Sequence, residues 1–147
     1  VLFASAYAQA QESVKILSTE NAKKIAAEAR RFAASVNAPH GGPSIAIVDR
    51  GGNLLYLERP EGTFAGSAEV AFGKARTAAL FEQPTKNFEM RIREGRTPLL
   101  STDFIMLEGG VPIILDGKVI GAIGISGAAS SQQDVEIAEA AAKLKLQ

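Results

Sequence analysis

The chain has 147 residues, the size of one domain, and its 46% hydrophobic content is enough for one sizeable core. It carries 16 basic and 16 acidic side chains, so its formal net charge is zero, which argues against nucleic acid as a partner. It has no cysteine, which excludes disulfides, thiol catalysis and cysteine-based metal sites. No run of 18 or more apolar residues predicts a membrane span.

Residues 1–11, VLFASAYAQAQ, lead from an apolar stretch into the small-x-small pattern Ala6-Tyr7-Ala8. This pattern is typical of the end of a secretory signal peptide, with cleavage near Ala8 or Ala10. The alternative is an ordinary N-terminal extension. The first interpretation predicts a secreted protein, in the periplasm or outside the cell.

The next segment predicts a helix followed by a β-hairpin. Ser18 or Thr19 can cap a helix whose apolar stripe ends before Pro39. Residues 44–49 read as a buried strand, and residues 54–59 as its partner. The sequence RGGN between them has the composition of a turn.

The second half predicts two helices, three strands and a last helix. The helices are expected from Ser67 to about Phe81 and from Thr85 to Gly95. Strands are expected over residues 104–107, 111–115 and from 118 onward, the last two joined by the turn Asp116-Gly117. The final helix is expected to begin at Ser131. The prediction is one α+β domain over residues 19–147, with an antiparallel sheet of about five strands, flanking helices and a profilin-like order.

Three glycines recur at every third position in residues 119–127, VIGAIGISG. A dinucleotide site would need the spacing G-x-G-x-x-G in a parallel strand–turn–helix unit, and this run follows a hairpin instead. The glycines therefore favour a strand that another backbone, a helix or a flat ligand approaches closely. Where the run meets the last helix, we expect either an anion site or ordinary helix capping by four residues: Ser126, Gly127, Ser130 and Ser131.

Five short blocks together resemble the GlcG/HbpS family, also called the haem-degrading domain and similar to the C-terminal domain of PduO-type proteins. The blocks are VDRGGN (48–53), FGKARTA (72–78), GGVPI (109–113), GAIGISG (121–127) and Gln133-Asp134. The likeness covers residues 19–144. It implies an antiparallel sheet with flanking helices, assembly into homo-oligomers, and haem binding in characterised members, some of which are secreted.

A haem site needs an apolar surface, a cation for the propionates and, in many proteins, an iron ligand. The predicted haem- or ligand-binding residues are Thr102, Phe104, Lys74, Arg59 and His40. His40, the only histidine, and Thr102 are the candidate iron ligands, although each would be an ordinary loop residue if no haem binds. Met90 and Met106 are further possible ligands, and Met106 is better explained as core. Lys74 and Arg76 are not expected to line one pocket together, because positions i and i+2 do not share a helix face. Lys74 is preferred for contacting an anionic group because it belongs to the block that resembles the family.

Two functions stay open at this point. The first is a secreted or periplasmic haem-binding protein, for which binding alone and haem degradation are alternatives. The second is a module without haem that binds a small carboxylate or serves oligomeric assembly. A hydrolase is disfavoured because Ser126 has no G-x-S-x-G context and the single histidine completes no triad. The catalytic residues are unknown.

Overall fold

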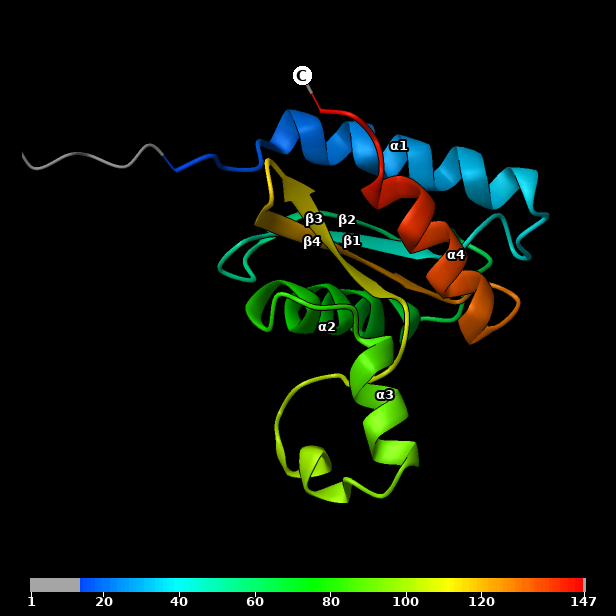
Figure 1. Cartoon of the computed structure of the whole chain (residues 1–147). Helices are drawn as coiled ribbons and strands as arrows, with labels where there is room; N and C mark the ends of the chain where they lie inside the picture. Colours follow the sequence, from blue (N-terminus) through cyan, green and yellow to red (C-terminus); the bar gives the residue numbers. More distant parts are fainter. Residues whose placement is uncertain (1–13, 147) are drawn as a thin grey trace, which may run out of the picture.

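The computed structural model describes residues 14–146, which form a sheet between two layers of helices (Figure 1). The elements in chain order are α1 (Thr19–Ser35), β1 (Ser44–Asp49), β2 (Leu54–Glu58), α2 (Ser67–Leu80), α3 (Lys86–Arg93), the 3₁₀ helix η1 (Thr97–Ser101), β3 (Gly110–Leu115), β4 (Lys118–Ser126) and α4 (Ser131–Ala142). The strands are antiparallel in the order β2-β1-β4-β3. Helices α1 and α4 cover one face, and α2 covers the other.

The α+β class is confirmed, but the sheet described has four strands, and the predicted strand at residues 104–107 is wrong. That segment is irregular. Its apolar side chains pack against helices instead of entering a ladder: the ring of Phe104 meets Phe81, and Met106 is buried. The side chain of Ile105 fills the space beside Gly73 on α2. The predictions for residues 1–11 lie outside the described part of the chain.

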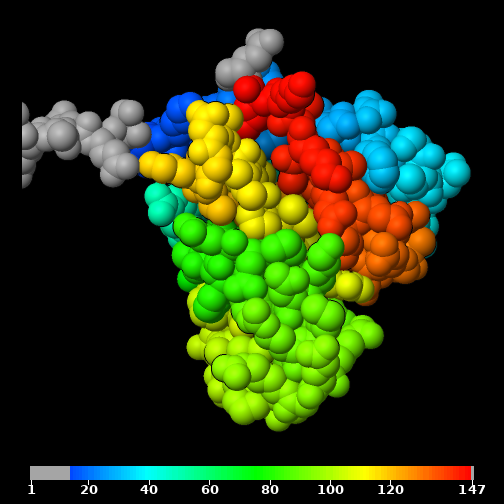
Figure 2. Space-filling model, viewed as in Figure 1, coloured from blue at the N-terminus to red at the C-terminus, as the bar shows by residue number. Residues whose placement is uncertain are grey.

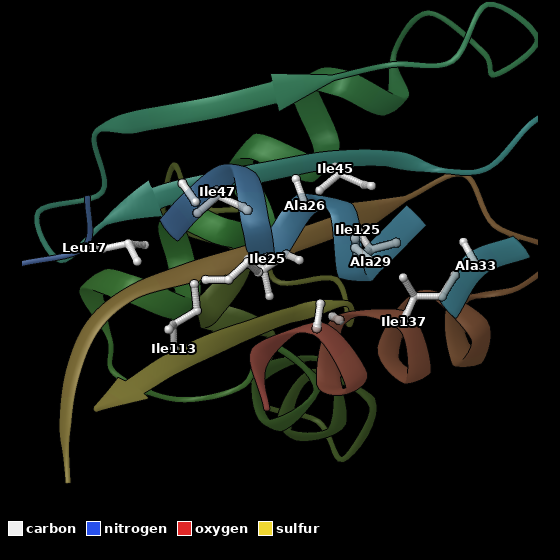
Figure 3. Close-up of a cluster of buried hydrophobic side chains, with 14 of the residues drawn as sticks. Leu17, Ile25, Ala26, Ala29, Ala33, Ile45, Ile47, Ile113, Ile125 and Ile137 are labelled. Carbon is white, nitrogen blue, oxygen red and sulfur yellow. The ribbon is translucent and has the colours of Figure 1, made fainter. Parts of the chain in front are cut away.

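The larger core lies between the sheet and the pair α1 and α4 (Figure 3). Ser18 starts α1, since its Oγ accepts a hydrogen bond from the Asn21 amide at 3.1 Å. The buried face of α1 is a stripe of small and branched residues: Ala22, Ile25, Ala26, Ala29 and Ala33. This stripe meets isoleucines from the sheet and Ile137 from α4. Periodicity in the sequence thus fixes which side of α1 is buried.

Helix α2 lies close to the other face because glycines and alanines leave room for it. Gly110 of β3 pairs directly with Gly124 of β4. A Cβ at Gly124 would overlap the backbone of Ala71 and Ala75 on α2. The prediction that the glycine run serves close approach is therefore confirmed, and the approaching element is a helix.

Residues 82–109, here called the arm, project from the α2 side of the molecule (Figures 1 and 2). The arm contains α3 and η1, which pack on each other. Its two ends are fixed: the Gly110 amide donates to Thr85 Oγ1 at 2.8 Å, and the Glu108 amide donates to Glu89 Oε2 at 2.7 Å. Within residues 14–146, no helix has the length and apolar character needed to cross a membrane.

Candidate functional site

Three aromatic rings meet where the arm leaves α2. Phe81 contacts Phe104 edge-on, with ring centroids 5.0 Å apart, and contacts Phe88 in a similar geometry at 5.3 Å. The guanidinium of Arg76 lies 5.9 Å from the centroid of the Phe104 ring. We call Arg76, Phe81, Phe88, Phe104 and the neighbouring Thr102 the aromatic surface. It combines flat apolar area with one cation and one hydroxyl.

The aromatic surface is partly open to solvent: Phe88 is buried and Phe104 is half-buried, whereas Arg76, Phe81 and Thr102 are exposed. Phe81 is 40% exposed, and Leu100, two residues before Thr102, is 64% exposed. Thr102 is itself exposed at the end of η1, and its hydroxyl donates to the carbonyl of Leu99 at 2.9 Å. The hydroxyl oxygen keeps its acceptor capacity toward a ligand. An exposed aromatic ring beside an exposed arginine offers an apolar and a cationic contact to a ligand.

Lys74, the cation predicted to contact a ligand, points inward instead. It is only 3% exposed. Its Nζ donates to the Ile125 carbonyl at 2.8 Å and to Asp134 Oδ2 at 3.0 Å. The ammonium group therefore joins α2 to the end of β4 and to the start of α4, on the opposite side of the sheet.

The predicted anion site at the start of α4 already holds a carboxylate of the chain itself. The Ala128 amide donates to Asp134 Oδ1 at 3.0 Å, and Ser130 caps the helix by accepting from the Gln133 amide at 3.1 Å. Burial raises the pKa of Asp134 above its ordinary value, while Lys74 and the nearby amides oppose this rise. Binding of an external anion by Ser126, Gly127, Ser130 and Ser131 stays a prediction.

Arg59 lies in a different place, at a cavity between the end of α1 and the end of β2. This α1–β2 cavity has a volume of about 300 Å³. It is lined by Arg30, Ala33, Ala34, Ala38, Gly41, Gly42, Pro43, Ile45, Glu58, Arg59 and Pro60. Arg30 donates to Glu58 Oε2 at 2.6 Å and to the hydroxyl of Tyr56 at 3.2 Å. A cavity of this size lies at the lower end of the range for small-molecule sites, too small to enclose a tetrapyrrole.

His40 lies beside this cavity without lining it. It is exposed and has a positive φ of 60°, and its carbonyl packs against Gly62. The loop after α1 that carries His40 and the arm that carries Thr102 lie at different ends of the molecule (Figure 1). The structure therefore separates the two predicted iron ligands. In residues 14–146, no group of three or more His, Cys, Asp or Glu side chains could hold a metal ion.

The two methionines lie in different environments. Met106 is buried, as its interpretation as core predicts, whereas Met90 on α3 is exposed. The sequence reasoning missed Arg30 and Glu58. The alternation of side chains along β2 places Tyr56 and Glu58 on one face of the strand, and this could have been predicted from the sequence. No local pattern in the sequence indicates that Arg30, on a helix, contacts them.

Comparisons with known proteins agree on one family. The family described as "Haem degrading protein HbpS-like" matches residues 17–143. Protein GlcG of Escherichia coli K12 is 44% identical over 84 residues, which span 56% of this chain and 63% of GlcG. An uncharacterized 15.0 kDa protein of Citrobacter freundii is 33% identical over 135 residues, covering 88% of this chain and 92% of that protein.

Solved structures agree with the sequence comparisons. Klebsiella pneumoniae ORFY superposes with a TM-score of 0.80 at 28% identity, covering 90% of this chain and 92% of that one. A Streptomyces reticuli HbpS double mutant superposes with a TM-score of 0.79 at 30% identity, covering 97% of this chain and 95% of that one. The structure of a PduOC–haem complex superposes with a TM-score of 0.75 at 26% identity, covering 87% of this chain and 94% of that one. Sequence and fold together place this chain in the family of HbpS-like haem-degrading proteins.

Proposed function

We propose that this protein binds haem on the aromatic surface. The observation that carries the proposal is the edge-to-face pair formed by the exposed ring of Phe81 and the half-buried ring of Phe104, with Arg76 beside it and Thr102 two positions before Phe104 in the sequence. Family membership and the structural likeness to a haem complex of PduOC support it. A porphyrin is flat and apolar at its centre and anionic at its propionates, so it matches this combination of groups.

Each residue of the aromatic surface would make a different kind of contact with haem. Phe81 and Phe104 would contact the porphyrin face or edge. Arg76 is exposed and has no carboxylate partner among the described residues, so its guanidinium is available to a propionate. Thr102 would present an exposed hydroxyl to iron or to a propionate. The role predicted for Lys74 thus passes to Arg76, since the ammonium group of Lys74 is used inside the fold.

Bound haem would supply the redox chemistry of its iron, and the protein would orient it and limit its contact with water. Because the aromatic surface covers only one side of a flat ligand, a second copy of the chain closing over it is part of the proposal. A periplasmic or extracellular location is proposed from residues 1–11.

The test is a haemin titration of tag-free protein followed by absorbance. We expect a saturable shift of the Soret band, weakened severalfold by Arg76→Gln and by Phe104→Leu. Arg31→Gln is the matched control, because Arg31 is an exposed arginine on α1, which covers the opposite face of the sheet from α2. Thr102→Ala should change the band position if its oxygen binds iron. His40→Ala should leave the titration unchanged. A wild-type protein that gives no saturable shift would remove haem as its ligand.

A further inference from the structure

The α1–β2 cavity contains one cation that is not neutralised by the protein. Arg59 donates from Nη1 to the carbonyls of Thr63, at 2.6 Å, and Pro60, at 3.4 Å, and no acidic side chain among the described residues pairs with it. Among the described residues, no protein atom accepts a hydrogen bond from the Nε or Nη2 of Arg59. A guanidinium with two donor sides still open can bind a carboxylate in bidentate geometry.

The same cavity contains an acceptor that lacks a donor. Glu58 Oε2 receives hydrogen bonds from Arg30 and from the Tyr56 hydroxyl, at 2.6 and 2.8 Å. Its other oxygen, Oε1, is buried and has no hydrogen-bond partner within the described chain. Leaving a carboxylate oxygen buried and unpaired is costly. The terminal torsion of a glutamate is soft, so a small rotation can bring Oε1 to a donor that enters the cavity.

The charges in the cavity select the ligand. Arg30 and Arg59 are positive and Glu58 is negative, so these lining groups carry a net charge of +1. A monoanion neutralises this charge, whereas a zwitterion leaves it unbalanced. The rest of the wall is short and apolar, with Ala33, Pro43 and Ile45 among its residues, so it suits a compact carbon skeleton.

We propose that the α1–β2 cavity binds a small organic monocarboxylate that also carries a hydrogen-bond donor. The ligand carboxylate would bind the open side of Arg59, and its hydroxyl would donate to Glu58 Oε1. Haem does not fit this volume, and Phe81 and Phe104 do not line the cavity, so this site is separate from the haem site proposed above.

The test is isothermal titration of the wild-type protein with three probes of similar size: lactate, propionate and alanine. Propionate has the carbon skeleton of lactate without its hydroxyl, and alanine replaces the hydroxyl with an ammonium group that makes the probe neutral overall. We expect saturable lactate binding, at least severalfold tighter than that of propionate or alanine. No saturable binding of lactate, equal binding of lactate and propionate, or tighter binding of alanine would each overturn the proposal.

Variants then separate the two contacts. Arg59→Gln should weaken lactate and propionate alike, by about tenfold or more, because each loses a charge-assisted bidentate contact. Glu58→Gln should reduce the preference for lactate over propionate toward one. Arg96→Gln, on an exposed arginine of the arm, is the matched control and should change neither probe. Unfolding curves confirm that each variant is folded. Haemin titration of Arg59→Gln should match the wild type, so failure of either site can be recognised independently of the other.

Discussion

Removing one member of the Lys74–Asp134 ion pair should destabilise the protein far more than removing both. The two side chains are nearly excluded from solvent, and their N–O distance is 3.0 Å. We expect Lys74→Met or Asp134→Asn to cost about 3–5 kcal/mol, because each leaves a buried charge without its partner. The double variant Lys74→Met/Asp134→Asn removes both charges, so its cost should be well below the sum of the two single costs.

Urea unfolding at pH 7 and at acidic pH measures these costs. Burial raises the pKa of Asp134 above its ordinary value of 3.8, against the effects of Lys74 and of the amides of Ala128 and Gly127. The stability linked to this rise is complete below pH 3.8 and is lost as pH increases through the folded-state pKa. In Lys74→Met the pKa of Asp134 should rise further, because an opposing cation is gone. The cost of Lys74→Met should therefore shrink as pH falls. This account of a buried, mutually dependent ion pair would be refuted by two results together: each single variant lowers the free energy of unfolding by less than about 1 kcal/mol, and the two losses simply add in the double variant.

Three further predictions concern the backbone and the arm. Gly124→Ala should destabilise the protein by about 1–3 kcal/mol in denaturant unfolding, because its Cβ would overlap α2, whereas a Cβ at Gly66 would make only ordinary contacts of 3.9 Å with the Phe64 ring, so Gly66→Ala should cost little. Glu82 has a φ of 53° just after α2, so Glu82→Gly should be neutral or stabilise the fold by about 0.5 kcal/mol, and a clear loss would contradict the strain argument. Burial acts to raise the pKa of Glu89, but the Glu108 amide and Arg93 outweigh it and the pKa lies below 4.5. Glu89→Gln should therefore reduce hydrogen-exchange protection of the Glu108 amide at pH 7, and the difference from wild type should fade as pH falls below the ordinary pKa of glutamate. Equal protection in both proteins at pH 7 would show that Glu89 does not hold the arm.

Most elements could be predicted because their signals are local. The cap at Ser18, the RGGN turn and the Asp116-Gly117 hairpin each depend on a few adjacent residues. The strand predicted at residues 104–107 was wrong because an apolar run of that length fits either a strand or a segment packed on helices, and only the position of α2 and the arm decides.

The site was harder to predict than the fold because its contacts join distant parts of the chain. Arg30 meets Glu58 across 28 positions, and Lys74 meets Asp134 across 60. Residue type alone marks Arg59 and Lys74 as equivalent cations. The structure distinguishes them, since Arg59 faces a cavity while Lys74 is enclosed.

The close approach of α2 explains why the two cations of the FGKARTA block end in different environments. Gly110 and Gly124 allow α2 to lie against the sheet, and Gly110 packs directly beneath the backbone of Lys74. The side chain of Lys74 is buried, and its Nζ meets Asp134. Arg76, two positions on, must point to another side of the helix, toward Phe104 and solvent. The same small residues that pack the helix thus assign one cation to the core and leave the other exposed beside Phe104.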